Sequence, residues 1–500
     1  MSKKNDNLPE LVFSSADDPA QAKRVSRLAR TNKLRKIRAG VYTSNLESPL
    51  DSVVQRNWRA IAEHLNPGAV VGYRSAIRAG PEAGKLFLVQ GKRATRIALP
   101  GLELVIVPGA GPVTEGSAGD APYGALFVAS EPRRLLENLS TGKGSAERAT
   151  GRVAVESDLE RILMLRGERG LNTLRDAARE LAPKLGLETQ FESLDQIVAA
   201  LLASYDAKVL HSKSARARAA GRPYDPERLP LFDALFQTLH ETVFERVDDP
   251  APRGRSMENF AFFEAYFSNF IEGTEFTVEE AEDIIFRGKI VAQRREDSHD
   301  VKGTFQALTA EPWRGKPAGT ADEFLAWIKS VNALVMQARS DRRPGEWKEK
   351  PNQAGSTLFV LPELVPGTLR EGFERMRALT DPLARALMTM FVVAEVHPFA
   401  DGNGRTARIA SNAHLTQAGL SRIIIPTVYR EDYVMSLKAL SNQGDPAAYV
   451  GAMTRALRWS ASLNWDEPRS GVRAVLEACN AFKEDLRNYK LVFPERLPRT

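Results

Sequence analysis

The segment 397–408, HPFADGNGRTAR, brings an imidazole, a carboxylate and two guanidiniums together around a glycine-rich turn. If a helix begins near Gly404, its first amides are unpaired and its dipole favours an anion. Arg405 and Arg408 are three residues apart, so both lie on one face of that helix. Two forked guanidiniums beside a helix start suit a di- or triphosphate. The segment therefore predicts a phosphate-binding site.

Two further side chains of this segment suit phosphate chemistry. Asp401 offers a hard oxygen ligand beside the phosphates, which is how Mg²⁺ is commonly held together with a nucleotide. His397 precedes the turn, and an imidazole titrates near neutral pH, as a general base requires. A lone histidine, a D-G-N-G turn or two helical arginines are each common structural features. Only their combination indicates a site.

The flanking residues predict the elements that position these groups. Residues 383–396 are apolar nearly all round, which is typical of a buried helix. Pro398 ends that helix, and residues 401–404 form a tight turn tolerant of positive φ. A second helix is expected from about Gly404 to Gln417, with Gly419 as a left-handed stop.

The same twelve residues resemble the core motif of Fic-domain proteins, HPFx[DE]GN[GK]RxxR, at every specified position, and the resemblance covers about residues 228–465. It implies an α-helical domain that moves AMP from ATP to a Ser, Thr or Tyr hydroxyl of a target protein. The resemblance implies that His397 would be the base and that Asp401 would hold Mg²⁺. The anion hole would be lined by Gly402, Asn403 and Gly404. The β-phosphate would be contacted by Arg405 and the γ-phosphate by Arg408. Glycine at 404, where some relatives have lysine, favours AMP transfer.

A second motif, SNFIEG at 268–273, ends an amphipathic helix that begins near Met257. It resembles the inhibitory motif [ST]xxxE[GN] of Fic proteins and supplies Ser268, Glu272 and Gly273. The resemblance implies that Glu272 pairs with Arg408 and takes the place of the γ-phosphate. The residues alone favour a solvated glutamate at a helix end. In some relatives this glutamate positions a water for AMP removal, and the sequence does not choose the direction.

Two regions match places in the family with further roles. An extended segment at 355–363 lies where relatives have a β-hairpin flap that aligns the target, which makes Leu358, Phe359 and Val360 candidates for target binding. Tyr433 lies where relatives wall the adenine. Each of these side chains also fits an ordinary core position.

The N-terminal region is basic. Residues 21–40 hold eight Lys and Arg and no acidic residue, which indicates an anionic partner such as DNA or, equally, a solvated helix face. A helix over 18–32 is expected to precede a short basic hairpin in KLRKIRAGVYTS. These residues resemble the winged helix of AbiEi-type antitoxins, which implies DNA contact, although few residues precede the helix to support it.

Length and composition bound the rest. The chain has 500 residues, a net charge of +6 and one cysteine, Cys479, so an internal disulfide framework is excluded. No apolar run is long enough for a membrane span and no signal peptide is recognised, so a cytoplasmic location without membrane attachment is expected. No G-x-x-x-x-G-K-[ST] loop occurs.

We expect a multidomain α+β protein. The predicted parts are a winged-helix-like domain at 1–65, an antitoxin-like α/β region at 66–210, a linker at 211–227, a mainly α-helical Fic domain with a short hairpin flap at 228–465, and a helical extension at 466–500.

The first functional hypothesis is an auto-inhibited protein adenylyltransferase that uses ATP and Mg²⁺. A nucleotide-sensing, DNA-binding regulator of toxin–antitoxin type is the second hypothesis. The third is AMP removal, or transfer of another phosphate group, on the same fold. The expected partners are ATP, an unknown target protein or a second site on the chain itself, DNA at residues 21–40, and a further copy of the chain in a homo-oligomer.

Overall fold

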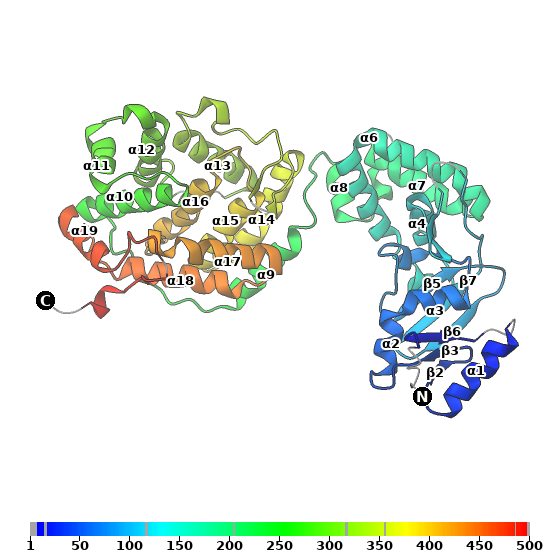
Figure 1. The fold of residues 1–500 in the computed structure, drawn as a ribbon. Helices are drawn as coiled ribbons and strands as arrows, with labels where there is room; N and C mark the ends of the chain where they lie inside the picture. Colours follow the sequence, from blue (N-terminus) through cyan, green and yellow to red (C-terminus); the bar gives the residue numbers. More distant parts are fainter. Residues whose placement is uncertain are drawn as a thin grey trace. The chain divides into compact units, whose positions relative to one another are not determined.

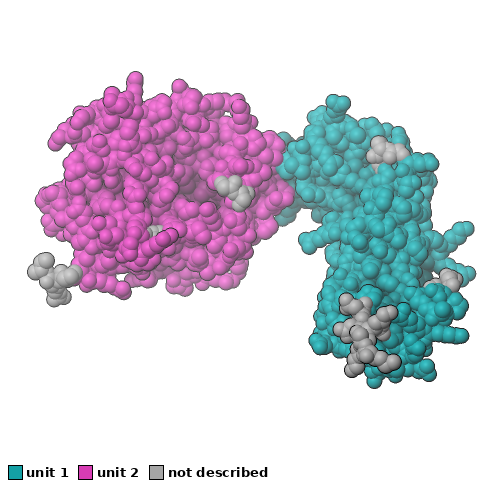
Figure 2. Space-filling model, viewed as in Figure 1, with its two compact units in different colours: residues 1–221 teal, residues 222–500 magenta. Residues whose placement is uncertain are grey.

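A computed structural model of the chain describes residues 8–14, 18–115, 119–203, 206–315, 319–354, 357–485 and 487–497. The chain divides into two compact units, residues 1–221 and 222–500 (Figures 1 and 2). Within the described residues, no helix combines the length and apolar character needed to cross a membrane.

The first unit begins with a helix and hairpin in the basic region. Strand β1 (Leu11–Phe13) precedes helix α1 (Pro19–Arg30), and Asp18 caps α1 by accepting a bond from the amide of Gln21 at 3.0 Å. Strands β2 (Arg35–Arg38) and β3 (Val41–Thr43) form the predicted antiparallel hairpin. The resulting sheet has the order β1-β3-β2.

The next segment adds a six-stranded sheet of order β6-β7-β5-β4-β9-β8. Strand β5 pairs with β7 in parallel and β4 pairs with β9 in parallel, while the other neighbours are antiparallel. The elements of this segment are α2 (Leu50–Arg56), α3 (Trp58–Leu65), β4 (Val70–Val71), η1 (Tyr73–Ala76), β5 (Lys85–Val89), β6 (Thr95–Leu99), β7 (Leu102–Val107), β8 (Ala121–Tyr123) and β9 (Leu126–Val128).

One core joins the hairpin to this sheet. Ile37 and Val41 of the hairpin share an apolar cluster with Val53 of α2 and with Leu88 and Leu104 of the six-stranded sheet. Apolar side chains on both sides of residue 65 therefore bury each other. The boundary predicted between residues 65 and 66 does not separate two cores.

Helices complete the first unit: α4 (Glu131–Asn138), α5 (Ser145–Arg148), α6 (Arg152–Leu185), α7 (Glu188–Leu201), η2 (Ala207–Val209) and α8 (Lys213–Ala219). Helix α6 is interrupted at Gly167, whose φ is +66°. The prediction of a linker over 211–227 is wrong for its first half. Ser212 caps α8 through the amide of Ala215, and the Ala215 side chain is buried against α6 and α7.

The second unit is mainly helical. Its elements are α9 (Leu229–Glu241), α10 (Gly254–Ile271), α11 (Val278–Arg287), η3 (Ala292–Arg294), α12 (Arg295–Thr309), α13 (Ala321–Val335), η4 (Ser340–Arg342), β10 (Gln353–Ala354), β11 (Thr357–Leu358), η5 (Pro362–Leu364), α14 (Val365–Ala378), α15 (Pro382–Val396), α16 (Asn403–Gln417), η6 (Thr427–Tyr429), α17 (Arg430–Gln443), α18 (Ala447–Ala461), α19 (Arg469–Ala478) and η7 (Pro494–Arg496). Helices α15 and α16 pack against each other at its centre (Figure 1). Nearly every side chain of α15 is buried, as predicted.

Candidate active site

The turn between α15 and α16 has two left-handed residues. His397 caps α15 with φ at +52°, and Gly402 caps the start of α16 with φ at +76°. The side chain of Asn403 braces the turn, because its Oδ1 accepts from the amide of Phe399 at 2.8 Å and its Nδ2 donates to the carbonyl of Phe399 at 2.9 Å. The Asn403 side chain is thus used within the turn, and only its backbone remains for the predicted anion hole.

A pocket of about 300 Å³ opens beside this turn. It brings together residues from distant parts of the chain, including the predicted residues Glu272, Phe359, His397, Gly404, Arg408 and Tyr433. Apolar side chains from α15 and α17 form the remaining wall, among them Phe391 and Leu437. Asp401, Gly402, Asn403 and Arg405 belong to the turn and helix start but do not line this pocket.

The imidazole of His397 is held in a defined protonation state. Its Nδ1 lies 3.2 Å from the carbonyl oxygen of Ala394. A carbonyl only accepts, so Nδ1 carries the proton and Nε2 is the free basic nitrogen. Burial lowers the pKa of His397 to about 4, although the bond to Ala394 acts in the opposite direction. The ring is therefore a neutral base at physiological pH.

Arg408 is bound by the end of helix α10. Its Nε donates to Oγ of Ser268 at 2.9 Å, and its Nη2 donates to the Ser268 carbonyl at 2.9 Å and to Oε1 of Glu272 at 2.7 Å. Gly273 ends the helix with φ at +85°. The predicted pairing of Glu272 with Arg408 is present in the structure. Its effect on activity stays a prediction.

The Glu272 carboxylate lies at the first turn of α16. A β-carbon at residue 404 would overlap sterically with Oε1 of Glu272, so glycine at this position leaves room for the carboxylate. Burial alone would raise the pKa of Glu272, but the cations of Arg408 and Arg405 outweigh it and the pKa is lowered. Tyr433 closes the site, with its ring centroid 6.0 Å from Cζ of Arg408. An anion already occupies this helix start.

Arg405 is held away from the pocket in this structure, and its contact with the β-phosphate stays a prediction. Its Nη1 donates to Oδ2 of Asp300 at 2.6 Å and to Oδ1 of Asn269 at 3.3 Å. The same Asp300 oxygen accepts from Nε of Arg339 at 2.9 Å. The guanidinium of Arg405 is thus paired with a buried carboxylate and does not reach the pocket. Sequence reasoning missed Asp300 because no motif surrounds it in α12.

Asp401 has a partly exposed carboxylate, whose Oδ1 lies 3.8 Å from Nη2 of Arg405. Its carboxylate is 40% exposed, and Oδ1 accepts a bond from the amide of Gly402 at 2.6 Å. Among the described residues, no group of three or more His, Cys, Asp or Glu side chains could hold a metal by itself. Mg²⁺ typically takes one or two carboxylates and completes its shell with phosphate oxygens and water. The accessible carboxylate of Asp401 fits that arrangement.

The flap contains two short antiparallel strands, β10 and β11, in which Ala354 pairs with Thr357. Residues 355 and 356 of the predicted extended segment lie outside the described residues. The Phe359 ring stacks on His397, with centroids 3.8 Å apart and planes 8° from parallel. Leu358 is exposed, whereas Val360 is fully buried. The Val360 side chain lies in the core and is not presented to a target, and target binding by this segment stays a prediction.

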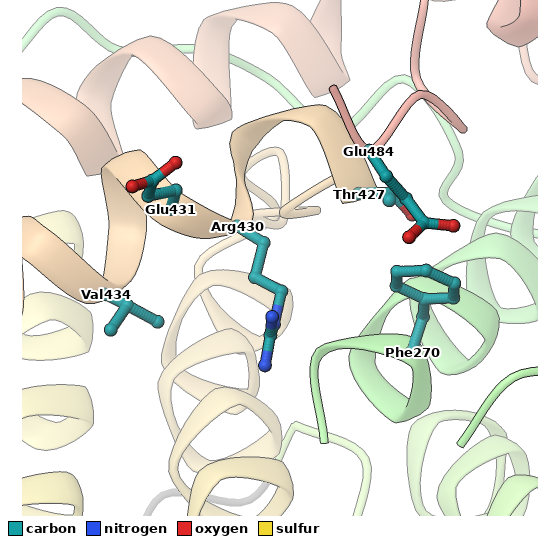
Figure 3. A pocket seen from close by; sticks show the side chains of 6 residues that line it. All are labelled: Phe270, Thr427, Arg430, Glu431, Val434 and Glu484. Carbon is teal, nitrogen blue, oxygen red and sulfur yellow. The ribbon is translucent and has the colours of Figure 1, made fainter. Parts of the chain in front are cut away.

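Arg430 at the start of α17 was not found by sequence reasoning. Its Nε donates to the carbonyl of Ile271 at 3.0 Å, which ties α17 to the residue before Glu272. Arg430 also lines a second pocket of about 360 Å³ (Figure 3). In that view the Arg430 side chain extends between Val434 on one side and Phe270 on the other, while Glu431 and Glu484 lie nearer its backbone end.

Comparison with known proteins identifies the domain that carries this site. Residues 324–415 match the model of the Fic/DOC family, so the chain contains a Fic domain. The motif segment 397–408 lies inside the matched region. The family match does not include the N-terminal unit.

Curated relatives are named protein adenylyltransferases. The chain is 25% identical to protein adenylyltransferase fic-1 of Caenorhabditis briggsae over 44% of its length and 46% of the relative's. It is 24% identical to fic-1 of Caenorhabditis elegans over 64% of its length and 63% of the relative's. The chain thus spans roughly half to two thirds of these relatives. A Fic domain-containing signaling protein from Bacteroides thetaiotaomicron VPI-5482 matches in structure with a TM-score of 0.38 and 19% identity, over 49% of this chain and 97% of that protein.

Proposed function

We propose that this protein is an auto-inhibited adenylyltransferase that moves AMP from ATP to a Ser, Thr or Tyr hydroxyl of a target protein. One observation carries the proposal: the free Nε2 of His397 and the guanidinium of Arg408 belong to one pocket at the start of α16. A base for a hydroxyl and a cation for phosphate are the two groups that this reaction requires.

In the proposed reaction, the target hydroxyl oxygen attacks the α-phosphorus of ATP in line with the leaving group. Its proton passes to Nε2 of His397, the new P–O bond forms, and pyrophosphate leaves with the electrons of the broken bond. The amides at the start of α16 and the Arg408 guanidinium would stabilise the triphosphate. Asp401 would hold Mg²⁺, which neutralises phosphate charge when bound.

The Glu272–Arg408 pair is the proposed brake. Arg408 cannot give the same Nη2 donor to Glu272 and to a γ-phosphate. The Glu272 carboxylate also lies where the helix dipole favours an anion. ATP would therefore bind without its γ-phosphate on Arg408, in a pose unfit for in-line attack.

The test is incorporation of label from ATP. The Glu272→Gly protein is incubated with Mg²⁺ and ATP labelled at the α-phosphate, and the intact mass is then measured. Covalent AMP that disappears in the Glu272→Gly/His397→Ala double variant supports the proposal. In a parallel incubation with ATP labelled at the γ-phosphate, label that appears only there would indicate phosphoryl transfer. Release of AMP from a modified target would indicate the reverse activity. Absence of any covalent label on the chain or on lysate proteins would contradict the proposed function.

We also propose DNA binding by the basic face of the first unit, defined here as residues 21–40. Helix α1 presents Lys23, Arg24, Arg27 and Arg30 to solvent, and the hairpin that follows adds exposed Lys36. Exposed cations on a helix and an adjoining hairpin suit phosphate contacts on a duplex.

Fluorescence anisotropy with a random-sequence duplex at about 50 and 200 mM salt tests this second proposal. The Arg27→Glu/Arg30→Glu variant should lose most of the salt-sensitive binding. The Lys92→Glu/Arg93→Glu variant makes the same charge change outside residues 21–40 and serves as its control. Equal binding by both variants would contradict a role for the basic face.

A further inference from the structure

Lys348 is a buried cation without a buried anion beside it. It is 4% exposed, and its Nζ donates to Oδ1 of Asn352 at 2.6 Å and to the carbonyl of Val396 at 3.4 Å. No ion pair of Lys348 is found in the described part of the chain. Burying an ammonium group with only neutral acceptors is costly, and burial lowers its pKa to about 7. A methionine would fill a similar space at less cost, so the ammonium calls for a functional explanation.

The segment that contains Lys348 is bonded to both sides of His397. The amide of Lys348 donates to the carbonyl of Pro398 at 2.9 Å, and Nδ2 of Asn352 donates to the carbonyl of Phe399 at 3.1 Å. With the bond from Lys348 to Val396, one segment contacts three carbonyls of the loop 396–399. That loop carries the proposed base.

The same segment also holds the flap. The amide of Phe359 donates to the carbonyl of Asn352 at 3.2 Å. The Phe359 ring stacks on the imidazole of His397, and Nζ of Lys348 lies 6.0 Å from the centroid of that ring. Lys348 and Asn352 therefore connect the flap to the catalytic loop through two polar side chains and one aromatic ring.

We propose that Lys348 is a positioning residue of the transfer reaction, which holds the flap and the loop 396–399 in one arrangement so that Nε2 of His397 faces the pocket. The role of Lys348 in AMP transfer rests on the proposed function. The arrangement of the flap and the loop 396–399 rests on the contacts described above. The cost of the buried ammonium is offset by the alignment it maintains, since small misplacement of a reacting group strongly lowers a rate.

The charges around the imidazole give the inference a distinct signature. Burial is the largest cause of the lowered pKa of His397. The Lys348 cation lowers this pKa further, while Glu272 and Asp401 raise it. Arg228 is the cation that faces Lys348 itself. Replacing Lys348 with an uncharged side chain of similar length should therefore shift the imidazole pKa upward. A residue that merely fills space would not produce that shift.

The experiment compares Lys348→Met with Lys350→Met in the Glu272→Gly background. Lys350 is exposed and lies two residues further along the chain, so it is a matched control. The titration of His397 is followed by NMR from pH 7.5 down to about pH 4, the range that contains its lowered pKa, and AMP transfer is measured by intact mass. We expect His397 to become protonated at a higher pH in the Lys348→Met protein. We also expect kcat to fall by roughly 10- to 100-fold with an unchanged Kd for ATP.

An unchanged kcat in Lys348→Met would overturn the inference, whether or not the imidazole titration shifts. If Lys348→Met does not fold, Asn352→Ala removes the main acceptor of Nζ and should lower kcat in the same direction; full activity of that variant would also overturn it. A shifted titration in a protein that never transfers AMP would remove the proposed function and keep the arrangement. If Lys348→Met transfers AMP at an unchanged rate, the proposed function stands and the positioning role of Lys348 falls.

Discussion

Oε1 of Glu272 lies 2.7 Å from Nη2 of Arg408. A β-carbon at position 404 would overlap with this oxygen, so only glycine fits there without displacing the carboxylate. The motif glycine and the upstream glutamate thus fit each other sterically, although they lie 132 positions apart in sequence, at 404 and 272. A carboxylate held by a buried guanidinium at a helix start resembles a bound phosphate oxygen in charge and position.

The first prediction concerns this pair. Glu272→Gly should raise AMP transfer by roughly 10- to 100-fold, which corresponds to the 1.5–3 kcal/mol of a typical charge-assisted hydrogen bond. It should also tighten ATP binding more than AMP binding, because only ATP has a γ-phosphate for Arg408. Kd values for both nucleotides, measured by calorimetry, check this. Glu275→Gly removes an exposed glutamate nearby and should change neither quantity.

The second prediction concerns the pH dependence of the base. His397→Ala should lower transfer by roughly 10²- to 10⁴-fold, the usual contribution of a general base. Because burial lowers the pKa of His397 to about 4, the imidazole stays unprotonated as the pH falls from 7.5 to 5.5. The Glu272→Gly enzyme should therefore show no loss of kcat over that interval. A fall centred near pH 6.5, the ordinary value for histidine, would contradict a buried neutral base.

Local features of the chain could be predicted from sequence. The helix before Pro398 and the second helix after the turn are both confirmed. The short apolar runs KLFLV, TRIAL and LELVIV form strands β5, β6 and β7. Each depends on periodicity or on residues a few positions apart, which a sequence displays directly.

Contacts between distant residues could not be predicted. Asp300 takes Arg405 away from the pocket, and nothing near either residue in sequence indicates the pair. The stack of Phe359 on His397 and the bonds of Lys348 depend on how loops meet in space. Helix α8 was mistaken for linker because its polar, basic composition resembles one, yet Ala215 packs into a core that only the fold reveals.

The third prediction separates the three flap residues. Phe359→Ala removes the ring that stacks on His397 and should lower transfer by roughly 2- to 10-fold, as expected for an aromatic pair worth about 0.5–1.5 kcal/mol. Val360→Ala should instead lower stability by about 1–3 kcal/mol, because the side chain is fully buried. Leu358→Ala should change neither the rate of transfer nor the stability of the isolated protein. Urea unfolding and self-modification assays on the three variants distinguish these outcomes, and equal effects of all three would contradict the assignment.

The fourth prediction concerns acid stability. His414 is buried in α16, with Nε2 3.0 Å from Oγ1 of Thr389, and burial lowers its pKa to about 4. In the unfolded chain both histidines take up a proton near pH 6.5, whereas in the folded chain His414 and His397 stay neutral down to about pH 4. Their contribution to the free energy of unfolding is therefore fully present above pH 6.5 and is lost as the pH falls toward 4. Each histidine contributes a slope of about 1.4 kcal/mol per pH unit. Five of the six tryptophans lie in residues 222–500, so urea unfolding followed by tryptophan fluorescence at pH 7 and 5 reports on this unit. His414→Gln should reduce the difference in unfolding free energy between the two pH values; an unchanged difference would show that other groups control acid unfolding.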